Sequence, residues 1–254
     1  GIIIIEDFGN LSFDKVLLKK KNKLNTYKKL VDLLLKIQKI KPQTKIKNII
    51  SKKHVIKIYS KKYLQEESDL FFNWYLPLLF KKNKVNDIKR KIKKILKKLY
   101  KRLYFKNSCF VHRDYHSQNL MKVNEKIGVI DSQDALIGHP AYDLVSLVDD
   151  VRIKTSQKLK KQIYDYYLTN ADEKYRLRSD KFLEDFNVLS VQRSLKIIGI
   201  FSRLFKRDNK SKYMKFIPYT WKLLEMRMNS RIFLNLKKIL EKNISQKQRK
   251  KILK

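Results

Sequence analysis

The side chains best suited to chemistry lie in one short segment, residues 112–119, and at one position twelve residues beyond it. The segment reads His-Arg-Asp-Tyr-His-Ser-Gln-Asn, and Asp131 follows an apolar run. The carboxylate of Asp114 could orient and deprotonate an attacking hydroxyl group, while Asn119 and Asp131 offer the oxygen ligands that Mg²⁺ prefers. A base for a hydroxyl group beside a magnesium site is what phosphoryl transfer requires. The sequence therefore predicts phosphoryl transfer, with Asp114 as base and Asn119 and Asp131 as metal ligands.

The spacing of these residues is more specific than any one of them. His-Arg-Asp followed after four residues by Asn119 fits the H-R-D-x-x-x-x-N pattern of kinase catalytic loops. A lone His-Arg-Asp could lie on any surface, but the added asparagine and strand-end aspartate form a strong set. A loop of this length lets Asp114 face an acceptor while Asn119 turns back toward a metal beside Asp131. We expect the three residues to converge on one point.

Other interpretations of nearby residues are less favoured or remain open. A metal site of His112 and His116 would need a shared helix face and usually a neighbouring glutamate, and the sequence meets neither condition. A nucleophile pair of Cys109 and His112 lacks a predictable activating base and an oxyanion-hole glycine, so Cys109 is expected to be a small buried residue on a strand. Asp143 lies in the first turn of a helix after Pro140, where it either complements the helix dipole or holds the catalytic loop.

The elements that must position these residues are mostly helices. Apolar residues recur at three- and four-residue steps over 24–40, which predicts a helix with one buried face. Similar patterns predict helices over 61–79, 85–104, 142–151, 158–168, 182–205, 213–228 and 232–240. Short β-like runs are predicted at 109–111, 120–123 and 128–130, and another at 2–5. The predicted fold class is α+β, a mostly helical domain around a small central β-structure.

Bulk composition limits the possible partners and compartments. No apolar run approaches the roughly 20 residues that span a bilayer, so no membrane span is expected. A single cysteine in 254 residues favours a reducing compartment, and we expect a cytoplasmic protein. The formal net charge of +37 would attract any polyanion. It is spread along the chain, without an aromatic-interleaved basic stripe or zinc-finger spacing, so no specific nucleic-acid partner is expected.

Together these residues resemble the aminoglycoside phosphotransferase and choline kinase superfamily, and more narrowly its anomeric kinases of N-acetylmuramate and N-acetylglucosamine. The similar segments are residues 6–9, 69–76, 112–121, 130–144 and 192–201, so the likeness covers most of the chain. The resemblance implies a protein-kinase-like fold, mostly its helical carboxy-terminal lobe. It also implies ATP as co-substrate, Mg²⁺, an amino-sugar hydroxyl as acceptor and a place in cell-wall recycling.

The resemblance further implies which part of such a kinase this chain carries. Residues 1–10 correspond to the last strand of the nucleotide-binding lobe and the hinge, where Glu6, Asp7 and Phe8 would contact the nucleotide. Residues 11–254 correspond to the helical catalytic and substrate-binding lobe. A complete kinase also needs a phosphate-covering loop and a lysine–glutamate pair, and none of the five glycines here forms G-x-G-x-x-G. The chain is therefore expected to be a fragment that lacks the amino-terminal lobe.

Six further positions are carried over from the family, three that support the catalytic loop and three that contact the sugar. They are His112, Arg113 and Asp143 for the loop, and His116, Gln133 and Asp134 for the sugar. One departure is Ser132, where the subfamily tends to place an aromatic residue. Two alternatives stay open: a truncated pseudoenzyme or basic module that binds nucleotide or polyanion without turnover, and a kinase for choline, homoserine or an aminoglycoside.

Overall fold

The computed structural model describes residues 6–46 and 54–251 of the chain. The chain divides into two compact units, which we call unit 1 (residues 1–58 and 107–179) and unit 2 (residues 59–106 and 180–254). The strand predicted at residues 2–5 lies outside the described residues. The division of the chain at residue 10 therefore stays a prediction.

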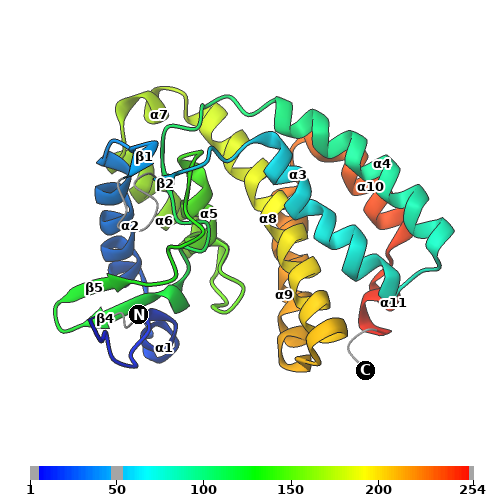
Figure 1. The fold of residues 1–254 in the computed structure, drawn as a ribbon, viewed down its shortest axis with the longest axis horizontal. Helices are drawn as coiled ribbons and strands as arrows, with labels where there is room; N and C mark the ends of the chain where they lie inside the picture. Colours follow the sequence, from blue (N-terminus) through cyan, green and yellow to red (C-terminus); the bar gives the residue numbers. More distant parts are fainter. Residues whose placement is uncertain (1–5, 47–53, 252–254) are drawn as a thin grey trace. The chain divides into compact units, whose positions relative to one another are not determined.

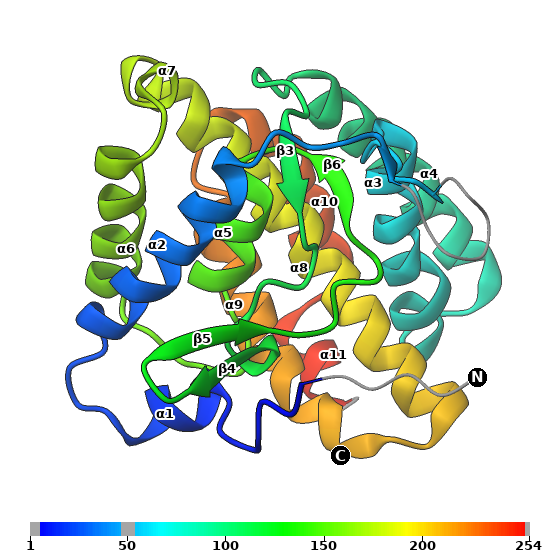
Figure 2. The ribbon, with the colours of Figure 1, turned by 60° about the vertical axis from the view of Figure 1, so that its left-hand side comes forward.

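Unit 1 holds residues 112–119, which we call the catalytic segment, and is built on paired helices. Its described helices are α1 (Phe13–Lys19), α2 (Leu24–Lys39), α5 (Ala141–Val148), α6 (Gln157–Asn170) and α7 (Glu173–Leu177). Helix α2 packs along α6 (Figure 2), and its residues Tyr27, Leu30, Val31 and Leu34 are buried. These residues recur at the three- and four-residue spacing that places side chains on one helix face. The helix predicted over 24–40 is confirmed.

Three two-stranded antiparallel sheets complete the described part of unit 1. The pairs are β1 (Lys45–Ile46) with β2 (His54–Val55), β3 (Cys109–Val111) with β6 (Leu136–Gly138), and β4 (Leu120–Val123) with β5 (Lys126–Val129). The β4–β5 hairpin turns at Asn124, whose φ of 52° is a left-handed conformation that asparagine tolerates. The strands β3, β4 and β5 agree with the prediction, whereas β1, β2 and β6 were not predicted. The catalytic segment runs from β3 to β4, and Asp131 follows β5. Figure 1 shows the β4–β5 hairpin beside α1.

Unit 2 is helical in its described residues. Its elements are α3 (Lys61–Leu70), the π-helical η1 (Phe71–Tyr75), the 3₁₀ segment η2 (Leu76–Leu78), α4 (Lys82–Lys101), α8 (Ser179–Asp208), the 3₁₀ segments η4 (Ser211–Phe216) and η5 (Arg231–Phe233), α9 (Ile217–Arg227), α10 (Leu234–Asn243) and α11 (Gln246–Lys251). The helix predicted over 61–79 consists of three different helical segments, α3, η1 and η2. Pro77 lies near the start of η2, where its missing N–H does not allow an α-helix to continue. None of the described helices combines the length and apolar character needed to cross a membrane.

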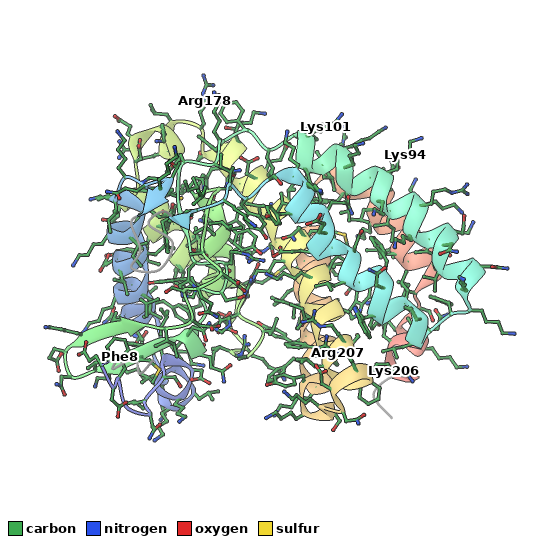
Figure 3. All side chains as sticks on the ribbon, viewed as in Figure 1. Phe8, Lys94, Lys101, Arg178, Lys206 and Arg207 are labelled. Atoms are coloured by element: carbon green, nitrogen blue, oxygen red, sulfur yellow. The ribbon has the colours of Figure 1, made fainter. Side chains whose placement is uncertain are left out.

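A close helix crossing organises unit 2. A Cβ atom added at Gly199 of α8 would lie 2.3 Å from the carbonyl carbon of Leu70, at the end of α3. Only glycine permits this approach of two backbones. Helix α4 buries Ile88, Ile92 and Leu96 and leaves its lysines in solvent; Figure 3 labels Lys94 among them. The lysine-rich face of α4 is therefore its solvated face, as predicted.

Candidate active site

A buried carboxylate fixes the start of the catalytic segment. Arg113 has a φ of 74°, a left-handed conformation that is uncommon for residues other than glycine. The carboxylate of Asp143 accepts hydrogen bonds from the backbone N–H groups of His112 (2.7 Å) and Arg113 (3.0 Å). Asp143 is only 1% exposed and lies in the first turn of α5. Its two charge-assisted hydrogen bonds hold the backbone in this conformation.

The imidazole of His112 joins the segment to the chain beside Asp131. The backbone N–H of Asp114 donates to Nδ1 of His112 at 3.3 Å, and Nε2 lies 2.9 Å from the carbonyl oxygen of Ile130. Because Nδ1 accepts a hydrogen bond, the proton is assigned to Nε2, which donates to Ile130. The ring is 2% exposed. His112 therefore links the position of Asp114 to the strand end that carries Asp131.

The side chains of Asn119 and Asp131 are in contact. The amide Nδ2 of Asn119 donates to Oδ2 of Asp131 at 3.3 Å and to the backbone carbonyl of Asp114 at 3.1 Å. The amide of Gln133 donates to the other oxygen of Asp131 at 2.7 Å. Asp131 has a φ of 69°. The structure thus brings the predicted metal ligands together and joins Asp114 to them through its carbonyl group.

This donor set fits Mg²⁺. Both hydrogen bonds of Asn119 use the amide nitrogen, which leaves the amide oxygen to a cation. The two oxygens of Asp131 each accept one hydrogen bond and keep further lone pairs. Among the described residues, no group of three or more His, Cys, Asp or Glu side chains forms a metal site. Mg²⁺ in nucleotide sites is held by one or two protein oxygens with phosphates and water, which is what Asn119 and Asp131 offer.

A second buried carboxylate, Asp150, fixes the other half of the segment. It accepts hydrogen bonds from the backbone N–H and hydroxyl groups of Ser117 and from the backbone N–H of Arg152. Burial alone raises the pKa of Asp150. The charges of His116 and Arg152 and the hydrogen bonds outweigh it and hold the pKa below its ordinary value. Sequence reasoning missed Asp150 because the helix predicted to run to residue 151 ends at Val148.

The three predicted sugar contacts have different surroundings. Gln133 is held against Asp131, as described above. The side chain of Asp134 is 72% exposed, and Arg113 donates to its carbonyl oxygen at 3.2 Å. His116 is only 6% exposed and lies near Asp150. Gln133 and Asp134 therefore lie beside the candidate site. His116 is instead a buried residue that interacts with the charge of Asp150.

Of the predicted hinge residues, Phe8 contacts the hairpin that leads to Asp131. The ring of Phe8, labelled in Figure 3, covers Gly128 of β5 so closely that an added Cβ would lie 2.5 Å from a ring carbon. The carboxylate of Asp7 accepts from the backbone N–H of Gly9 at 2.7 Å, and Gly9 has a φ of 67°. Glu6 is exposed. Contact of these residues with a nucleotide stays a prediction.

Cys109 is buried in β3, as predicted, with 3% of its surface exposed. Burial, together with the negative charge of Asp143, raises the pKa of its thiol to about 12. A thiol of this kind is not a nucleophile at neutral pH. The structure thus supports the buried-residue interpretation of Cys109.

A comparison with protein families identifies the fold and its chemistry class. The model of the phosphotransferase enzyme family matches residues 15–178, more than half of the chain. The chain belongs to this phosphotransferase family. The match includes the catalytic segment, Asp131, Asp143 and Asp150. The resemblance found in the sequence is therefore confirmed at the level of the family.

Relatives of this chain include three bacterial proteins named N-acetylmuramate/N-acetylglucosamine kinase. That of Caulobacter vibrioides is 38% identical over 122 residues, which are 46% of this chain and 33% of the relative. Those of Neisseria meningitidis and Pseudomonas aeruginosa are each 28% identical, over 86% and 89% of this chain and 64% of each relative. The chain thus spans less than two thirds of the length of the relatives it matches.

Solved structures confirm the fold of this chain. A choline/ethanolamine kinase family protein from Mesorhizobium loti aligns with a TM-score of 0.57 and 10% identity, covering 92% of this chain and 70% of that protein. A spectinomycin phosphotransferase aligns with a TM-score of 0.51 and 16% identity, covering 85% and 68%. The predicted protein-kinase-like α+β fold is confirmed.

Proposed function

We propose that this chain is the hinge and catalytic lobe of an ATP-dependent kinase that phosphorylates the anomeric hydroxyl of N-acetylmuramate or N-acetylglucosamine. The observation that carries the proposal is the contact between Asn119 and Asp131, 3.3 Å apart and joined to Asp114 by the same amide group. The acceptor class is supported by the names of the three bacterial relatives. A cytoplasmic place in cell-wall recycling follows from that acceptor.

In this mechanism Asp114 accepts the proton of the sugar hydroxyl. The freed oxygen attacks the terminal phosphorus of ATP, and the bond from that phosphorus to the bridging oxygen of the leaving diphosphate breaks. The products are the sugar phosphate, ADP and one proton, which Asp114 later releases to water. His112 and Asp143 act on this step by fixing the backbone on either side of Arg113, and therefore the position of Asp114.

Asn119 and Asp131 would hold Mg²⁺ through the amide oxygen and the carboxylate. When bound, this ion neutralises charge on the nucleotide phosphates. Gln133 keeps the Asp131 carboxylate oriented by its 2.7 Å hydrogen bond. Glu6, Asp7 and Phe8 would meet the nucleotide along their backbone. Asp134 and His116 are the remaining proposed sugar contacts.

The proposal is tested by phosphate transfer from ATP to N-acetylmuramate, N-acetylglucosamine and, as a comparison acceptor, choline. The assay uses a protein that joins this chain to an amino-terminal nucleotide-binding lobe, because such a lobe carries the phosphate-covering loop and the lysine–glutamate pair. We expect transfer to the amino sugars, and we expect Asp114→Asn to lower kcat by about 10²–10⁴-fold, the usual contribution of a general base. The matched control is Asp165→Asn, which removes an exposed α6 carboxylate that pairs with Lys161. Binding of Mn²⁺ with ADP, followed by electron paramagnetic resonance, should survive Asp114→Asn and be lost in Asp131→Ala.

Two results would contradict the proposal. Turnover of Asp114→Asn equal to that of Asp165→Asn would remove Asp114 from the mechanism. Transfer to choline but to neither amino sugar would keep the chemistry and replace the acceptor.

A further inference from the structure

One cavity of unit 1 lies apart from the candidate active site. Its volume is about 550 Å³, and it is lined by residues of α1, of the start of α2 and of the β4–β5 hairpin. Of the described residues that line it, none belongs to the catalytic segment or to the turn at Asp131. Apolar side chains from α1 and its approach, and from β5, form part of its wall: Leu11, Phe13, Val16 and Ile127.

The rest of the wall is strongly basic. Five lysines line the cavity, and Glu125 is the one acidic residue among the described lining residues. The lysines come from three separate parts of the chain: Lys19, Lys20, Lys29, Lys122 and Lys126. Five positive charges and one negative charge leave a local excess of four. Charge that is spread along the sequence is thus gathered by the fold into one concave surface.

These ammonium groups are not neutralised within the described part of the chain. Among the described residues, no carboxylate lies within ion-pair distance of any of these five lysines, and no cation lies within ion-pair distance of Glu125. Other lysines of this protein do form ion pairs: Lys93 and Lys161, for example, each pair with an aspartate. Lys20 is instead fixed by donating to the hydroxyl oxygen of Thr26 at 3.0 Å, and Thr26 is 3% exposed. Thr26 lies in the first turn of α2, where the helix dipole adds positive potential. An uncompensated cationic wall of this kind attracts a compact anion.

We propose that this cavity binds an organic polyphosphate of the nucleoside polyphosphate class, with its phosphates on the lysines and its planar body on the apolar wall. The volume lies within the roughly 300–1,000 Å³ typical of small-molecule sites. The local charge of four positive units matches a ligand with three or four negative charges. Lysine provides point charges for phosphates rather than the fork with which arginine reads bases, which favours a small ligand over nucleic acid.

Binding here differs from nucleotide binding at Asn119 and Asp131 in its need for metal. The ammonium groups neutralise phosphate directly, so the cavity needs no Mg²⁺. The proposal is therefore independent of the proposed kinase activity. It predicts a nucleotide complex that survives a chelator, weakens as salt increases, and does not require Asp131.

The test is isothermal titration calorimetry of the full chain with ADP and with inorganic pyrophosphate, both in EDTA. We expect ADP to bind more tightly than pyrophosphate, because only ADP covers the apolar wall. Lys29→Glu with Lys126→Glu should weaken ADP binding by about tenfold or more, since two attracting charges become repelling. Lys29→Gln with Lys126→Gln should weaken it less. Asp131→Ala should leave it unchanged.

The matched control is Lys94→Glu with Lys98→Glu, an equal change of charge on α4, where both lysines are exposed. An equal loss of ADP binding in this control would show diffuse attraction by the whole basic surface and overturn the proposal. So would loss of binding in Asp131→Ala, equal affinity for ADP and pyrophosphate, or absence of binding in EDTA. Tighter, cavity-dependent binding of a single-stranded oligonucleotide would replace the small ligand with nucleic acid.

Discussion

Asp143 in unit 1 and Glu67 in unit 2 are both buried carboxylates, 1% and 8% exposed, and their partners differ in kind. Asp143 accepts from two backbone N–H groups of the catalytic segment. Glu67 of α3 pairs with Lys196 of α8 at 2.9 Å and accepts from the side chains of Gln192 and Tyr59. One carboxylate sets the conformation of a loop, and the other cross-links two helices.

The difference in partners predicts a difference in what each carboxylate controls. Backbone N–H groups keep their place in the chain whatever side chains surround them, so Asp143 acts on the geometry of residues 112–114. Side-chain partners bring a charge of their own, and Lys196 is itself 5% exposed. Loss of Glu67 should therefore appear mainly in stability, and loss of Asp143 mainly in the proposed reaction.

The largest effect on stability is expected from Glu67→Ala. This change should lower the free energy of unfolding by about 3–5 kcal/mol, because it removes the acidic member of the buried ion pair with Lys196. Urea unfolding measures the loss. The neighbouring Glu66→Ala is the control, since Glu66 is exposed and lies 3.9 Å from an exposed Lys62. That exposed pair should contribute less than about 1 kcal/mol.

A double variant sharpens this test. Glu67→Met combined with Lys196→Met removes both charges and should recover part of the stability lost in Glu67→Ala. If Glu67→Ala lowered the free energy of unfolding no more than Glu66→Ala does, the pair of Glu67 and Lys196 would contribute nothing measurable to stability. The proposed difference in role between Glu67 and Asp143 would then be wrong.

Asp143→Asn should have a smaller effect on stability and a larger one on the reaction. The amide offers one acceptor where the carboxylate offers two, so one N–H of His112 or Arg113 loses its partner, at a cost of about 1–3 kcal/mol. Displacement of Asp114 should lower kcat by roughly 10²-fold, as small misplacements of reacting groups do. Urea unfolding and amino-sugar phosphorylation, measured on the same variant and on Asp165→Asn, separate the two effects. A drop in stability with an unchanged kcat would mean that Asp143, like Glu67, acts on stability and not on the reaction.

The fold was predictable where an apolar pattern covered several helical turns. The prediction of 24–40 differs from the observed α2, Leu24–Lys39, by one residue. Helix α1 has only seven residues, too few to show a repeat, and β6 has three residues whose strand identity depends on pairing with β3. In the segment 61–79, the apolar spacing is helical throughout, and it does not distinguish an α-helix from the π and 3₁₀ turns that follow Leu70.

The candidate site was predictable where residues are close in sequence. Asp114, Asn119 and Asp131 follow from a motif that spans twenty residues including its ends. Asp150 and Glu67 have no such signal, because their partners lie far away in the chain: Ser117 is 33 positions from Asp150, and Gln192 is 125 positions from Glu67. The five lysines of the basic cavity are hidden for the same reason. Lysines that come together only in the tertiary structure cannot be recognised as a group in a sequence that has lysines throughout.

The smallest effect expected concerns pH and the second carboxylate of the catalytic segment. The pKa of Asp150 in the folded chain is held below its ordinary value, despite burial, by His116, Arg152 and Ser117. Its contribution to stability is therefore present above about pH 3.9, the ordinary aspartate value, and is lost as the pH falls through the lower folded-state pKa. Asp150→Asn removes this contribution, so the free energy of unfolding should fall less steeply with acid in the variant than in the parent chain. Urea unfolding between roughly pH 2 and pH 6 measures the slope, with Asp134→Asn, an exposed carboxylate, as the control. If the free energy of unfolding changed equally with pH in the parent chain and in both variants, the charge of Asp150 would not contribute to its contact with Ser117. Asp150 would then differ from Glu67, whose charge is paired with that of Lys196.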